Sequence, residues 1–140
     1  MIYLIDLEYV ETRYTAQWKS AFPQMIANAL KKEIISVEGP KEIPPSTSPG
    51  AFLNFGGTNI YKSAQVIEIA SKFTNDEIQD GDQFVFADAW HTGILQLKYM
   101  AELLQKDVTI HALWHAGSYD QHDFLGRLIG DKPWVRHTEE

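Results

Sequence analysis

Three side chains suited to ligand chemistry, Asp88, Trp90 and His91, stand at the end of a predicted apolar strand, Phe84–Asp88. In an open α/β sheet, ligands bind beyond the carboxyl ends of the strands, so these residues lie where such a fold holds its site. Asp88 could act as a general base or hold a ligand hydroxyl, or it could cap the helix that follows. His91 could be a base, a hydrogen-bond donor to a ligand, or an ordinary surface histidine.

A second group of polar side chains fills the segment His111–Asp123. A shared metal is not expected, because residues four apart on a strand, such as His111 and His115, are separated by about 13 Å. The remaining possible metal ligands in the segment are His115, Asp120 and His122. We expect His115, just past a strand end, to contact a ligand. Ser118 and Asp120 are further ligand candidates, although either could cap the last helix instead.

The predicted start of another helix carries Gly56, Gly57 and Thr58. Glycines allow close approach of the backbone, and free N–H groups at a helix start attract phosphates or carboxylates. A strand-to-helix turn also needs glycine, so a purely structural role is the alternative. Glu8, after the first strand, opens a turn without glycine, which argues against a dinucleotide-binding domain. Tryptophans could stack on a sugar or base, or simply pack: these are Trp90, Trp114 and Trp134.

Apolar runs and helical periodicity alternate along the chain and predict an α/β fold. The expected strands are Ile2–Leu7, Glu33–Val37, Ala51–Phe55, Phe84–Asp88 and Val108–Trp114. Predicted helices follow the first, third and fourth strands, the first of them kinked or divided at Pro23, and a short helix begins near Phe124. We expect one Rossmann-like three-layer domain over residues 1–140, with a mostly parallel sheet of about five strands. The common strand order places Asp6 and Glu8 opposite Asp88 across a crevice.

Composition limits the classes of partner. The formal charge of −7 repels phosphate backbones, so direct binding to nucleic acid is not expected. The chain has no cysteine, and no apolar run approaches the roughly 18 residues of a membrane span. Met1 leads directly into an apolar strand without a basic region, so no signal peptide is expected. These features predict a cytoplasmic protein that does not bind membranes, and no cofactor motif is present.

With these residues identified, the chain resembles the N-terminal half of GT-B glycosyltransferases of the kind encoded by tailed phages. The resemblance covers nearly the whole chain and rests on Glu11–Trp18, Phe86–Ile94, His111–Asp120 and Lys132–Glu140. It implies a Rossmann-like domain whose strand ends face a cleft that holds the acceptor, while a second domain binds the nucleotide-sugar donor. The resemblance implies that the acceptor contacts or the catalytic base are Asp88, His91 and His115. Because only the first half is matched, the resemblance implies either a half-length relative with another role or a protein that works with a partner that supplies the donor site.

These observations lead to one main hypothesis and two alternatives. The main hypothesis is glycosyltransferase-like binding of a nucleotide or sugar acceptor, with a protein partner or a second copy completing the site. The alternatives are a non-catalytic module that binds a protein and a small nucleotide-processing enzyme. The expected catalytic residues are Asp88 and His91, and the expected ligand-binding residues are Glu8, Gly56, Gly57, Thr58, Trp90, His115, Ser118 and Asp120.

Overall fold

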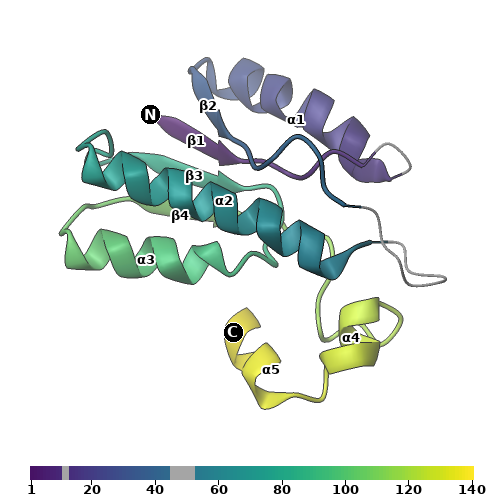
Figure 1. Cartoon of the computed structure of the whole chain (residues 1–140). Coiled ribbons are helices and arrows are strands. Elements are labelled where there is room, and N and C mark those ends of the chain that lie inside the picture. The colour runs from purple at the N-terminus through teal and green to yellow at the C-terminus, as the bar shows by residue number, and fades with distance from the viewer. Residues whose placement is uncertain (11–12, 45–52) are drawn as a thin grey trace.

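The computed structural model describes residues 1–10, 13–44 and 53–140 of the chain (Figure 1). Strands and helices alternate through most of this length, and two short helices follow the last strand. The elements are β1 (Ile2–Ile5), α1 (Tyr14–Leu30), β2 (Ile34–Val37), α2 (Phe55–Thr74), β3 (Gln83–Phe86), α3 (Gly93–Leu103), β4 (Thr109–Ala112), α4 (Phe124–Ile129) and α5 (Pro133–Glu139). A single helix, α1, runs through Pro23. None of the helices described here has the length and apolar character needed to cross a bilayer.

The strands form a parallel sheet in the order β2-β1-β3-β4. This confirms the predicted α/β fold with a parallel sheet, although the sheet has four strands in the described part of the chain. Part of the predicted strand Ala51–Phe55, residues 51–52, lies outside the described residues. At its other end the prediction of a strand is wrong, because Phe55 is the first residue of α2. The reason is local: the side chain of Asn54 accepts a hydrogen bond from the N–H of Gly57 at 2.8 Å and so starts the helix early.

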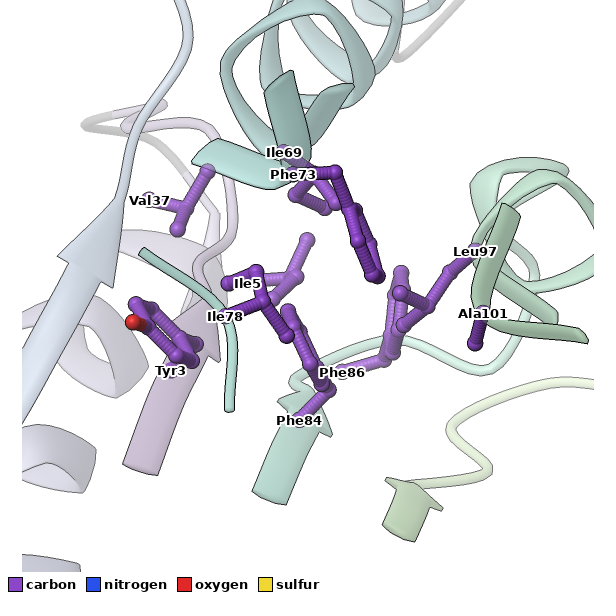
Figure 2. Packing of buried hydrophobic residues seen from close by; sticks show 10 residues of the cluster. All are labelled: Tyr3, Ile5, Val37, Ile69, Phe73, Ile78, Phe84, Phe86, Leu97 and Ala101. Carbon is purple, nitrogen blue, oxygen red and sulfur yellow. The ribbon is translucent and has the colours of Figure 1, made fainter. Parts of the chain in front are cut away.

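Helices cover both faces of the sheet, which gives the expected three layers. Helix α1 lies on one face, while α2 and α3 pack together on the other (Figure 1). The main core lies between the sheet and the α2–α3 pair, where Figure 2 shows Phe73 and Leu97 above Phe84 and Phe86. A smaller cluster around Leu4 faces α1. Because both faces are covered, every residue of β1 is buried, as the continuous apolar run predicts.

The two central strands determine where a site can form. From β1 the chain crosses to β2 on one side, whereas β3 is followed by β4 on the other side. Strand connections therefore diverge between β1 and β3, and a crevice opens at their carboxyl ends. Glu8 follows β1 and Asp88 follows β3, so the predicted juxtaposition of these two strand ends is confirmed. The last two helices, α4 and α5, lie beyond this end of the sheet (Figure 1).

Candidate functional site

A cavity of about 290 Å³ lies at the carboxyl ends of β1 and β3. Its walls come from the loops after these strands, the first turn of α1, the first two turns of α2, and the segment that carries α4 and α5. Five residues of the predicted site line it: Glu8, Thr58, Asp88, Trp90 and His115. The other five do not line it: Gly56, Gly57, His91, Ser118 and Asp120.

Asp88 is held in the cavity wall by two interactions. One carboxylate oxygen lies 3.1 Å from the Nζ atom of Lys62, and the other accepts the N–H of Trp90 at 3.0 Å. Lys62 Nζ also donates to the carbonyl oxygen of Trp90. Asp88 therefore shapes the loop after β3 rather than capping α3, whose N-cap residue is Thr92. Sequence reasoning missed Lys62. Residues four apart lie on the same face of a helix, so the position of Lys62 relative to Thr58 could have indicated that both face the rim.

Glu8 forms the corresponding acid–base pair on the β1 side. Its Oε1 atom accepts a hydrogen bond from Thr58 Oγ1 at 3.0 Å and lies 3.5 Å from the guanidinium of Arg13. Glu8 is only 4% exposed, so the carboxylate depends on these partners for stabilisation. Glu8 and Asp88 are thus each matched by a cation, and ligand hydroxyls can bond to both kinds of group.

Aromatic rings form much of the remaining wall. Tyr14, Trp90 and Trp134 line the cavity together with Phe55 and Phe124. Trp90 and Trp134 meet edge to face with centroids 6.4 Å apart, and Phe55 stacks on Phe124 at 5.6 Å. Rings fixed in this way present apolar faces on which a sugar or a base can stack.

His115 connects the loop after β4 to the end of β3. Its Nε2 atom donates to the carbonyl oxygen of Ala87 at 2.6 Å, which leaves Nδ1 as the acceptor nitrogen. The ring is flanked by Tyr14 at 5.5 Å and by Trp18 at 5.3 Å between centroids. His115 thus lies in the cavity wall in a fixed orientation.

His91 is turned away from the cavity and into the protein. Nδ1 accepts the N–H of Gly93 at 3.0 Å, so Nε2 carries the proton and donates to Gln65 Oε1 at 3.0 Å. Burial, helped by the charge of Lys62, lowers the pKa of His91 to about 4. His91 is therefore neutral near pH 7 and holds the start of α3 in place.

Gln65 is the buried centre of this network. Its side-chain N–H₂ donates to the carbonyl oxygens of Asp6 at 2.7 Å and Val37 at 2.8 Å, while its oxygen faces His91. One side chain of α2 therefore joins the ends of β1 and β2 to the loop after β3. Sequence reasoning missed Gln65, which lies in the apolar stripe of its helix and is fully buried.

Of the two glycines at the start of α2, Gly57 has a packing role. The N–H of Gly57 donates to Asn54, and a Cβ atom at Gly57 would clash with Ile43 Cγ2. Glycine at position 57 therefore lets the first turn of α2 pack closely against Ile43. At Gly56 a Cβ atom would meet only the Asn54 side chain, at 3.4 Å.

Ser118 is engaged by the C-terminal helix. Its N–H and hydroxyl both donate to the carboxylate of Glu139, which also accepts the indole N–H of Trp90 at 2.9 Å. Burial acts to raise the pKa of Glu139, but the hydrogen bonds from Ser118 and Trp90 lower it overall. Glu139 thereby fixes both α5 and the cavity-lining Trp90. Asp120 accepts the N–H of His122 and lines a separate shallow pocket. The described residues contain no cluster of three or more metal-binding side chains.

Asp6 lies behind the rim and points toward α1. Burial raises the pKa of its carboxyl to about 6 from 3.8, against the opposing effects of the Leu7 N–H and of Lys19 at 4.0 Å. Between these two values the folded protein holds a proton that the unfolded chain has lost, so the stability that Asp6 contributes is lost as the pH rises through this range.

We therefore expect Asp6→Asn to raise the free energy of unfolding by about 1–2 kcal/mol above pH 6. At about pH 4 the carboxyl is already protonated in the folded protein, so the variant and the wild type should differ little. Urea denaturation at several pH values measures this difference. A variant that is less stable than wild type at every pH would contradict a buried, destabilised carboxylate.

An apolar groove of about 760 Å³ adjoins the cavity along α3, β4 and α5. Leu95, Ile110 and Trp114 contribute to its walls, and Trp134 and Thr92 line both the groove and the cavity. Leu95, on α3, is 75% exposed although its side chain is large and apolar. The groove therefore presents apolar surface to the solvent.

The chain was also compared with known proteins. Searches against protein-family models, curated proteins and solved structures find no match.

Proposed function

We propose that this protein binds the sugar or nucleotide acceptor of a glycosyl transfer in the cavity at the carboxyl ends of β1 and β3. The observation that carries the proposal is the combination, at one rim, of carboxylate–cation pairs with fixed aromatic rings. Sugar rings are recognised by such a combination, because their hydroxyls bond to charged groups while their apolar faces stack on aromatic rings. The resemblance to acceptor domains supports the same assignment and a cytoplasmic location.

Asp88 is the proposed base. In the transfer it would accept the proton of the acceptor hydroxyl while that oxygen bonds to the anomeric carbon and the bond to the nucleotide leaving group breaks. His91 would act by positioning, because its contacts with Gln65 and Gly93 fix the loop that carries Asp88 and Trp90. The Lys62 ammonium keeps the Asp88 carboxylate aimed along the cavity wall.

The size of the cavity favours an acceptor over a donor. Small-molecule pockets typically measure about 300–1,000 Å³, and this cavity, at about 290 Å³, holds one ring system or a nucleoside. A complete nucleotide sugar needs more room. We therefore propose that a partner protein, or a second copy, supplies the donor site.

Thermal-shift measurements with a panel of hexoses, nucleosides and nucleotides test the binding proposal. At saturating concentration a specific ligand raises the Tm, because it binds the folded state alone. The wild-type protein should respond to at least one class of compound, and the response should saturate. A Tm that none of these compounds changes would overturn the proposal.

Binding of a protein is the second candidate function, and the apolar groove favours it. Trp134 and Thr92 belong to both surfaces, so a protein seated in the groove would adjoin the cavity, as a donor domain would. Leu95→Glu places a charge on the groove at an exposed position and should leave the fold intact. A partner that copurifies stoichiometrically with the wild type and is lost with Leu95→Glu would support this candidate. Equal recovery with both would contradict it.

A further inference from the structure

A shallow pocket of about 450 Å³ lies beside the cavity, in the loop after β4. His115 and Ala116 belong to the walls of both, so the two spaces meet at this point of the loop. A ligand with two linked rings can therefore place one ring in each. The proposed function uses the cavity alone and leaves the shallow pocket without a role.

Two aromatic side chains of the shallow pocket are open to solvent. Trp114 is 55% exposed and Tyr119 is 64% exposed. Within the described part of the chain, the Trp114 indole has no hydrogen bond and no stacked ring. It therefore offers a ligand an apolar ring together with a free N–H donor, which is the combination that sugar rings use.

The polar groups of the shallow pocket are mainly carboxylates, from Asp120 and Glu139. Asp120 accepts the N–H of His122 through Oδ1 at 2.8 Å, and its Oδ2 atom bonds to no other described residue. No lysine or arginine is among the described residues that line this pocket. A phosphate would meet carboxylates there without a compensating cation, whereas sugar hydroxyls can donate to them. The pocket thus favours a neutral sugar over a further nucleotide unit.

A cation is the other kind of ligand that aromatic rings and carboxylates can hold. On Tyr119 this position is already occupied, because the guanidinium of Arg136 lies 3.7 Å from the ring centroid. The Tyr119 hydroxyl donates to Glu140 at 2.7 Å, so this acid is engaged as well. The arrangement therefore favours an uncharged ligand that carries hydroxyls.

We propose that the acceptor is an oligosaccharide, and that the shallow pocket binds its second sugar unit, which stacks on Trp114 and donates a hydroxyl to Asp120. The inference rests on the proposed function and deepens it, because it names the class of acceptor. The cavity would hold the unit that receives the new sugar, and the shallow pocket would select acceptors of two or more units. Trp114 and Asp120 thus become specificity-determining residues.

Isothermal titration with sugars of different length tests the inference. The panel is maltotriose, cellotriose, chitotriose and mannotriose, each beside its own monosaccharide, with uridine and UMP for comparison. We expect at least one trisaccharide to bind about 3- to 10-fold tighter than its monosaccharide, because it adds a stacking contact. If no trisaccharide binds tighter than its monosaccharide, the inference is overturned, while binding of a monosaccharide, nucleoside or nucleotide keeps the proposed function. If no sugar, nucleoside or nucleotide binds, both fail.

Trp114→Ala should abolish the advantage of the trisaccharide and leave the Kd of the monosaccharide unchanged. The position is exposed, so the variant should fold. Trp114→Phe keeps an aromatic ring and should retain most of the advantage. Tyr99→Ala is the matched control, because Tyr99 is also an exposed aromatic residue, at 62%, but lies on α3 outside the shallow pocket. A trisaccharide that binds Trp114→Ala as tightly as the wild type overturns the inference.

The indole N–H signal of Trp114 gives a second measurement. In ¹⁵N-labelled protein a trisaccharide should shift this signal more than its monosaccharide does, because only the longer ligand reaches the shallow pocket. Choline serves as the probe for a cation. A Trp114 signal that responds to choline and to no trisaccharide would assign the pocket to a cation and overturn the inference.

Discussion

Gln65→Leu is expected to lower the free energy of unfolding by about 2–4 kcal/mol. Leucine has a similar volume but cannot bond to the carbonyl oxygen of Asp6 or to the ring of His91, and both groups would remain buried without this partner. Val37 is less affected, because its carbonyl oxygen also accepts the N–H of Asp6 at 3.3 Å. Urea denaturation of the two proteins measures the difference.

The matched control is Gln96→Leu on α3, where the glutamine is exposed. A surface change of this kind should alter stability by less than about 0.5 kcal/mol. Gln65→Glu adds a second comparison, because it keeps the size and one acceptor but places a charge in a fully buried position. If Gln65→Leu proved as stable as the control, the network would not hold the rim together.

Asp88→Asn should weaken ligand binding about 10- to 100-fold, because a hydrogen bond to a charged group is worth about 1.5–3 kcal/mol. The free energy of unfolding should change by less than about 1 kcal/mol, because the ion pair with Lys62 is partly exposed. The exposed fraction of the side chain is 23% for Asp88 and 15% for Lys62. Loss of binding without loss of folding is the combination that a ligand-binding residue requires. Titration with the compound that raises the Tm most measures the Kd.

Glu102→Gln is the control for this variant. Glu102 forms a surface pair with Lys98 at 3.0 Å, so the change also breaks an ion pair but lies outside the cavity. Its Kd should equal that of the wild type. An Asp88→Asn protein that binds normally would show that the carboxylate serves only to shape the loop after β3.

The architecture was predictable because its signals are local. Continuous apolar runs indicate buried parallel strands, and the order of strands and helices fixes which strand ends meet. These rules placed Glu8 and Asp88 at one rim. The prediction of a strand over Ala51–Phe55 is wrong at Phe55. The apolar pattern there indicates a strand, but the side chain of Asn54 caps a helix that begins at Phe55.

The details of the site depend on contacts that no sequence pattern carries. His91 follows Asp88 by three residues, yet it turns toward Gln65, because the path of the loop after β3 decides which side chain faces the cavity. Thr15 belongs to an ordinary helix start, yet its hydroxyl is buried. Such long-range pairings come from tertiary structure, beyond the reach of periodicity.

The indole N–H signals of the four tryptophans test the central claim most directly. In ¹⁵N-labelled protein titrated with glucose and with uridine, a ligand in the cavity should shift the signals of Trp90 and Trp134, whose rings line it. The signal of Trp114, which lines the groove and a neighbouring pocket instead, should move less. Saturable shifts at Trp90 and Trp134 are the predicted result. Shifts at Trp114 with none at Trp90, or no shift at any tryptophan, would contradict a binding site at the ends of β1 and β3.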